Sequence, residues 1–129
     1  MNPQRQSSSA RILLLGNGYG IQSSLSVLPT EGVVGIVAAA NRPSEVARVR
    51  ELGKLHSIPV YVQPYHSHHN DYQAFLKLIH GLSADVFVSN SYSMILDVAL
   101  LGIPPLGTIN VHNGLLPEYR GANVMNWAL

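Results

Sequence analysis

Short, continuous apolar runs alternate along this sequence with longer segments in which apolar residues recur every three or four positions. A continuous apolar run is typical of a strand buried on both faces, and the three-to-four spacing is typical of a helix with one buried face. We therefore expect strands over 11–15, 33–39, 58–62, 84–89 and 107–112, and helices over 19–28, 43–56, 71–82, 94–101 and 122–129.

This alternation predicts an α/β fold, a Rossmann-like open parallel sheet with helices on both faces. Right-handed crossovers favour a strand order of about 3-2-1-4-5, and Pro59 suits an edge position for the third strand. Residues 1–10 are expected to be a disordered tail, and residues 11–129 a partial domain. The sheet is expected to be incomplete on its C-terminal side, because the chain stops at Leu129 inside an expected helix.

Composition narrows the possible partners. Charged residues make up 12% of the 129 residues, against a usual share of about 25%. So few charges predict large buried surfaces, which a partner chain or a missing C-terminal segment would cover. The net charge of +1 includes no basic stripe, so we expect no nucleic acid partner. The absence of cysteine excludes disulfides and thiolate chemistry. The sequence shows no secretory signal and no membrane span, so we expect a cytoplasmic protein.

The candidate catalytic residues, Asn110 and His112, end the fifth expected strand. Being two apart, they project from the same face of that strand, at the edge where open α/β sheets bind ligands. The amide can donate to an oxygen that gains negative charge, and the imidazole can take a proton from an attacking amine or donate to the oxyanion. This pair predicts chemistry on a carbonyl group. In the loop that follows, a stiff apolar wall for a flat ring is formed by Leu115, Leu116 and Pro117. Arg120 offers a cation for a carboxylate or phosphate, and Gly121 permits close backbone approach.

The segment NVHNGLLPEYRG, which begins at Asn110, resembles the signature of the 10-formyltetrahydrofolate-dependent formyltransferases, with Gly114 where serine is common. SYSMILD at 91–97 is similar to the family's folate-lining segment. LLLGNG at 13–18 and ANRP at 40–43 are similar to the members that act on glycinamide ribonucleotide. RGANVMNWAL at 120–129 is more similar to the methionyl-tRNA and amino-sugar members.

The resemblance implies that Asn110 and His112 are two of three catalytic residues, and that 10-formyltetrahydrofolate donates a formyl group directly to a primary amine, without a metal. The third residue, an aspartate, is expected beyond Leu129, which predicts impaired activity for this chain alone. No second, basic domain is present, which favours a small-molecule acceptor such as an amino sugar. The implied folate contacts are Tyr92, Met94, Ile95, Leu96, Leu115, Leu116 and Pro117, and the implied acceptor contacts are Gly16, Asn17, Gly18, Arg120 and Gly121.

Two other interpretations remain open. The glycine turn at 16–20 follows a strand and is followed by a helix, as in an NADP-linked oxidoreductase, and Arg42 suits a 2′-phosphate, but the spacing is GxGxG instead of GxGxxG. A non-catalytic remnant that keeps the fold is the other alternative. His66, His68 and His69 cluster in sequence, and we interpret them as a solvated loop in preference to a metal site.

Overall fold

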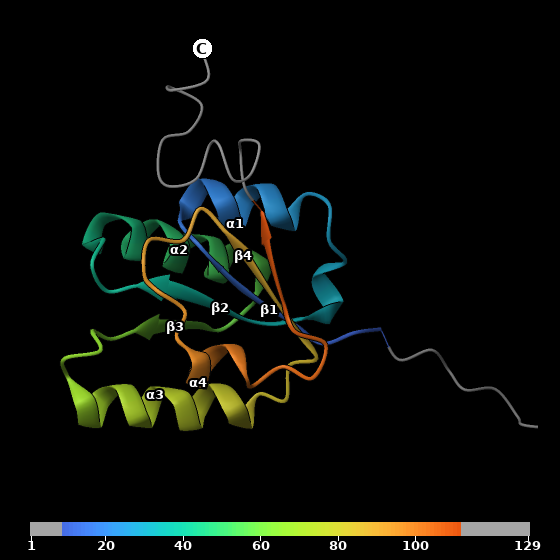
Figure 1. Cartoon of the computed structure of the whole chain (residues 1–129). Helices are drawn as coiled ribbons and strands as arrows, with labels where there is room; N and C mark the ends of the chain where they lie inside the picture. The colour runs from blue at the N-terminus through green and yellow to red at the C-terminus, as the bar shows by residue number, and fades with distance from the viewer. Residues whose placement is uncertain (1–8, 112–129) are drawn as a thin grey trace, which may run out of the picture.

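A five-stranded parallel sheet forms the centre of the computed structural model, which describes residues 9–111 (Figure 1). The strand order is β3-β2-β1-β4-β5, and all four neighbouring pairs are parallel. The predicted fold class and strand order are therefore confirmed. The strands are β1 (Ile12–Gly16), β2 (Val33–Ala39), β3 (Val60–Gln63), β4 (Val86–Asn90) and β5 (Thr108–Val111).

Helices cover both faces of the sheet (Figure 1). One face carries α1 (Gly18–Leu25) and α2 (Pro43–His56), and the opposite face carries α3 (His69–Gly81) and α4 (Val98–Leu101). A short 3-10 helix, η1 (Thr30–Gly32), leads into β2. Within the described part of the chain, none of the helices is both long and apolar enough to cross a membrane.

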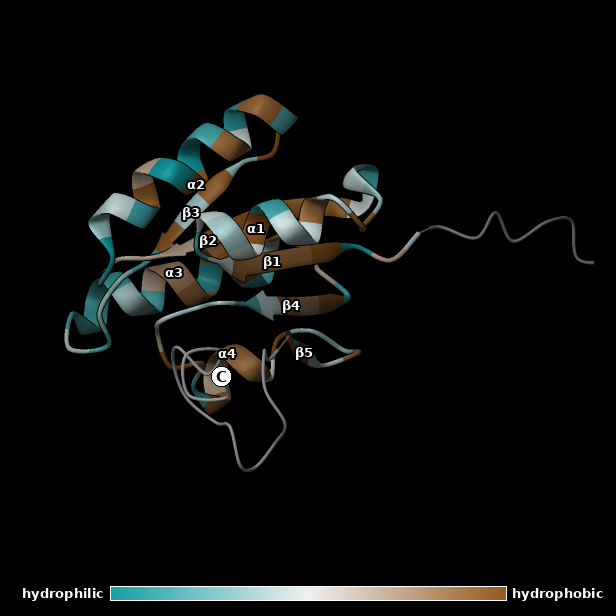
Figure 2. Cartoon of the chain, turned by 90° about the horizontal axis from the view of Figure 1, so that it is seen from above, coloured by the Kyte–Doolittle hydropathy of each residue, from teal (hydrophilic) through white to brown (hydrophobic). Residues whose placement is uncertain are grey.

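The central strand β1 contributes to two hydrophobic cores, one on each face of the sheet. Ile12 and Leu14 pack with α1 and α2, whereas Leu13 and Leu15 pack with α3 and α4. Burial on both faces explains why β1 is apolar along its length (Figure 2). In α2, which buries one face only, polar and apolar residues alternate (Figure 2).

Two predicted helix starts are wrong. The helix expected over 94–101 begins only at Val98, because the Asp97 side chain accepts a hydrogen bond from the Leu100 amide and caps the helix there. The helix expected over 71–82 begins earlier, at His69. The expected helix over 122–129 and most of the expected N-terminal tail lie outside the described residues.

Candidate functional site

Segments from three of the strands meet at the carboxyl-terminal edge of the sheet, where open α/β sheets bind their ligands. The glycine turn, residues 16–20, follows β1, and the loop of residues 91–97, hereafter loop 91–97, follows the neighbouring strand β4. The Asn17 amide donates a hydrogen bond to the Ser91 carbonyl oxygen over 3.2 Å. On β5, Asn110 lies beside Ser89, next to the end of β4. The edge thus brings together the segments that the sequence singles out.

The glycine turn packs tightly against the end of β4. A Cβ atom at Gly16 or Gly20 would collide with the Asn90 carbonyl oxygen. The buried Asn90 side chain donates to the Gly20 carbonyl oxygen and to the Ser24 hydroxyl, each over 3.2 Å. The Asn17 side chain accepts from the Gly20 amide over 2.8 Å and caps α1. Close packing of the glycine turn on the end of β4 therefore accounts for two of the glycines.

A carboxylate of the protein occupies the positive end of α1. Glu45, in the first turn of α2, accepts a hydrogen bond from the Gly18 amide over 2.7 Å. Arg48 approaches the other carboxylate oxygen to 3.5 Å. A dinucleotide pyrophosphate at this turn would compete with Glu45 for the same amide, and Arg42 is exposed beyond it. The geometry gives the NADP alternative no support.

Loop 91–97 crosses the carboxyl ends of three strands and is tied to each. Ser91 contacts the turn after β1 through the bond from Asn17. Ser93 contacts Asn41, after β2: its hydroxyl donates to the Asn41 side-chain oxygen over 2.7 Å, and the Asn41 amide donates back to the Ser93 carbonyl over 3.3 Å. Ile95 contacts Gln63, at the end of β3. The loop starts at Ser91 in a left-handed conformation, φ 56°, which turns the chain sideways across the sheet edge.

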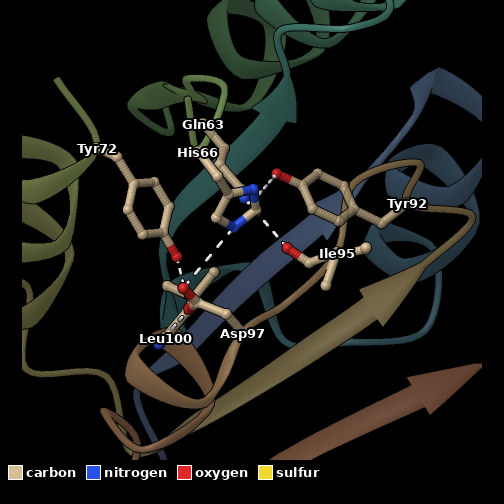
Figure 3. Close-up of polar contacts among 7 residues, drawn as sticks. All are labelled: Gln63, His66, Tyr72, Tyr92, Ile95, Asp97 and Leu100. Carbon is tan, nitrogen blue, oxygen red and sulfur yellow. Dashed lines mark hydrogen bonds and ion pairs between the residues drawn. The ribbon is translucent and has the colours of Figure 1, made fainter. Parts of the chain in front are cut away.

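Gln63 holds the middle of the loop through both ends of its side-chain amide (Figure 3). The Tyr92 hydroxyl donates to Gln63 Oε1 over 2.5 Å, and Gln63 Nε2 donates to the Ile95 carbonyl oxygen over 3.3 Å. Gln63 has no exposed surface. Burial, and to a lesser degree the neighbouring Tyr72, raises the pKa of Tyr92, so the hydroxyl stays a donor.

Asp97 fixes the far end of the loop (Figure 3). Its Oδ1 accepts from the Tyr72 hydroxyl over 2.6 Å and from the Leu100 amide over 3.0 Å. His66 Nε2 lies 3.8 Å from Asp97 Oδ2, and its ring packs against the ring of Tyr72. Burial raises the pKa of Tyr72 most, and the bond to Asp97 and the charge of Asp97 raise it further.

Sequence reasoning missed Gln63, Tyr72 and the anchoring role of Asp97. A signal was present for Gln63, because a polar residue directly after an apolar strand and before Pro64 lies at the ligand-binding edge. The histidine loop contacts Tyr72 and Asp97 through His66, while His68 and His69 are exposed. Among residues 9–111, no group of three His, Cys, Asp or Glu side chains is arranged to hold a metal ion.

The predicted site residues fall into two sets. Of the folate contacts predicted within the described residues, Tyr92, Met94 and Leu96 are half-buried, whereas Ile95 is 77% exposed. Asn110 is exposed on β5. These residues and the glycine turn lie at one edge, and their functional roles stay predictions. The other predicted residues, His112, Leu115, Leu116, Pro117, Arg120 and Gly121, lie outside the described residues.

A shallow hollow lies away from this edge, at the amino-terminal end of β4. None of the predicted site residues contributes to it, so we assign it no role. It is lined by His80, Ser83, Ala84, Asp85, Ile103 and Pro105.

Comparison with known proteins decides the family. A family model described as formyl transferase matches residues 10–129. This chain belongs to the formyl transferase family. The resemblance noted at the signature segment is therefore confirmed over nearly the whole chain.

Curated relatives of this formyl transferase chain include two methionyl-tRNA formyltransferases. That of Pelobacter propionicus (strain DSM 2379) is 36% identical, over 95% of this chain and 40% of the relative. That of Synechococcus sp. (strain JA-3-3Ab) is 37% identical, over 92% of this chain and 39% of the relative. The chain thus spans about 40% of the length of these relatives.

Solved structures share the formyl transferase fold. Phosphoribosylglycinamide formyltransferase from Streptococcus pneumoniae TIGR4 matches with a TM-score of 0.71 and 22% identity, over 92% of this chain and 65% of that one. A formyltetrahydrofolate deformylase from Pseudomonas syringae matches with a TM-score of 0.73 and 20% identity, over 95% and 42%. At these identities, the likeness concerns the fold.

Proposed function

We propose that this chain carries the folate-facing part of an enzyme that transfers a formyl group from 10-formyltetrahydrofolate to a primary amine. The observation that carries the proposal is the position of loop 91–97 and Asn110. Both lie at the carboxyl-terminal edge of the sheet, in a chain that the family model matches from residue 10 onward. This edge is where an open α/β sheet binds small ligands.

The surface of loop 91–97 fits a flat, partly polar ring. The polar side chains of Tyr92 and Asp97 are occupied by contacts within the protein. The apolar side chains of Met94 and Ile95 are left at least partly exposed. Ligand sites of this kind combine apolar side chains with a few backbone polar groups. When bound, the folate supplies a formyl carbon that an amine can attack.

Asn110 is suited to stabilise the oxygen of the formyl group during attack. Its carboxamide is exposed on β5, and an amide donor fixed where negative charge develops lowers the barrier. His112, outside the described residues, keeps its predicted roles in stabilising the oxyanion and in removing the proton of the amine. The third catalytic residue, an aspartate beyond Leu129, is part of the same proposal.

For the acceptor, we place the amino group of methionyl-tRNA first, because the relatives at 36% and 37% identity are methionyl-tRNA formyltransferases. The amino-sugar acceptor favoured by the sequence depended on the lack of a basic domain. A chain spanning about 40% of its relatives carries no such argument about the whole protein. Glu45 further favours an acceptor without a phosphate at the glycine turn, since that phosphate would meet a carboxylate.

The proposal is tested by a transfer assay. The residues of the Pelobacter propionicus relative that follow its matched region are joined to this chain, and formylation of methionyl-tRNA, glycinamide ribonucleotide and an amino sugar is measured with 10-formyltetrahydrofolate. We expect transfer to methionyl-tRNA, and a loss of about 100-fold or more in kcat for Asn110→Ala. Asn70→Ala, which removes an exposed amide on α3, is the matched control. Undiminished transfer by Asn110→Ala, or no transfer to any of the three amines, would overturn the proposal.

A further inference from the structure

Among the side chains that hold loop 91–97, Gln63 is the one most completely shielded from solvent. The Asn41–Ser93 pair is exposed, so water can replace either partner with little loss. Gln63, by contrast, has no exposed surface and bonds the loop at two points. Its removal would leave the Tyr92 hydroxyl and the Ile95 carbonyl oxygen, which both lie in partly buried contacts, without these partners, and such a loss costs more than that of an exposed pair.

The orientation of this amide follows from its partners. The Ile95 carbonyl oxygen can only accept a hydrogen bond, so the Gln63 NH2 group must face it. Gln63 Oε1 then faces the Tyr92 hydroxyl, which donates. One rigid group therefore sets the spacing between Tyr92 and Ile95, and with it the position of Met94 between them.

We propose that Gln63 is a positioning residue for formyl-folate, which acts through Tyr92 and Ile95 without touching the donor itself. This inference depends on the proposed function, because loop 91–97 is the segment that faces the folate in that proposal. Gln63 is the last residue of β3. In the order β3-β2-β1-β4, β3 is the strand farthest from β4, the strand from which loop 91–97 starts. A strand end remote from Asn110 would thus control the place of the donor.

The test compares Gln63→Met, which keeps the length of the side chain and removes both hydrogen bonds, with Gln73→Ala, which removes an exposed glutamine on α3. Hydrogen exchange of the whole chain reports on the loop without a ligand. We expect amide exchange in loop 91–97 to rise about tenfold in Gln63→Met, while the amides of β1 and β4 keep their protection. Unchanged exchange in the loop, or an equal rise throughout the sheet, would overturn the positioning role.

Calorimetric binding of 5-formyltetrahydrofolate, a stable isomer of the donor, gives the second readout. We expect Gln63→Met to weaken binding about tenfold, the equivalent of about one buried hydrogen bond, and Gln73→Ala to leave it unchanged. Equal affinity of Gln63→Met and the wild type, with the loop loosened, would overturn the inference and leave the proposed function standing. No binding by the wild type, with the exchange result as expected, would overturn the proposed function and the folate role of Gln63 with it.

Discussion

At the residue scale, Glu45 sets the electrostatics of the glycine turn. Its side chain is 26% exposed and accepts the Gly18 amide at the start of α1, where a negative charge is favourable. We expect Glu45→Ala to lower the free energy of unfolding by about 1–2 kcal/mol, because the bond to a charged acceptor is lost. Urea unfolding measures this change.

The control for this substitution is Glu51→Ala on the same helix. Glu51 is exposed and only approaches Lys54, so its removal should change stability by less than about 0.5 kcal/mol. Equal effects of the two substitutions would show that general charge on α2, and not the bond to Gly18, matters.

Tyr72, which is buried, and Tyr92, which is half-buried, make stability sensitive to alkaline pH. The pKa values of Tyr72 and Tyr92 are raised in the folded chain, whereas tyrosines of the unfolded chain have a pKa of about 10. Above about pH 10 the unfolded state therefore loses protons that the folded state keeps, and stability falls as pH rises. We expect each tyrosine to add up to about 1.4 kcal/mol per pH unit to this fall.

Urea unfolding of Tyr72→Phe and Tyr92→Phe at a series of alkaline pH values checks this effect. Each variant should show a shallower fall in stability than the wild type, while Tyr19→Phe, at an exposed tyrosine, should match the wild type. A wild-type slope in both Tyr72→Phe and Tyr92→Phe would contradict the assignment.

Single residues were predictable where local chemistry decides them. Asn110 and the glycine turn stand out by residue type and spacing, and they lie at the expected edge. The place of Gln63 at this edge carried a signal, but its bonds to Tyr92 and Ile95 were not predictable, because those partners are about thirty positions away and the contact exists only after the sheet forms. The chemical role of Asn110 remains a prediction.

At the element scale, α2 ends on a strained residue. Ser57 caps this helix in the left-handed conformation, φ 56°, which costs a non-glycine residue about 1–2 kcal/mol. Glycine removes this strain but loses more backbone entropy on folding, roughly 0.5–1 kcal/mol. We expect Ser57→Gly to raise the free energy of unfolding by about 0.5–1 kcal/mol in chemical denaturation.

Ser26→Gly is the matched control, because Ser26 caps α1 in a right-handed conformation, φ −73°. There glycine relieves no strain, adds the entropy loss and removes the hydrogen bond from the Ser26 hydroxyl to the Ser23 carbonyl oxygen (2.6 Å), so this variant should be destabilised. Stabilisation of both variants, or of neither, would disprove the strain argument.

Helix ends were predictable where the sequence carries a strong signal. α2 begins at Pro43 as expected, since proline suits the first helical turn. The start of α4 was missed, because apolar residues from Met94 onward continue the helical pattern through what is a loop. The Asp97 cap and the contacts of loop 91–97 override that local pattern.

At the scale of the whole molecule, both cores depend on β1. Leu14 belongs to the core under α1 and α2, and Leu15 to the core under α3 and α4, and both are fully buried. We expect Leu14→Ala and Leu15→Ala each to cost about 2–5 kcal/mol and to keep a single unfolding transition, because one strand joins the two cores. Val98→Ala, at an 86% exposed site, should cost little.

Circular dichroism and hydrogen exchange during denaturation distinguish a single unfolding transition from separate unfolding of the two cores. Loss of structure on one face of the sheet before the other, in either leucine variant, would show that the cores unfold independently.

The strand order itself was predictable, because strand–helix alternation with one crossover hand leaves few arrangements. The path of loop 91–97 over the ends of β1, β2 and β3 was not, since it depends on contacts between distant segments.

The most direct test of the account is an NMR titration of the isotope-labelled chain with 5-formyltetrahydrofolate. If formyl-folate binds at the carboxyl-terminal edge of the sheet, the backbone amides of Tyr92 to Leu96 and of Asn110 will shift with ligand concentration, while those near Asp85, at the opposite end of β4, will not. Shifts confined to the region of Asp85, or no shifts at all, would contradict the account.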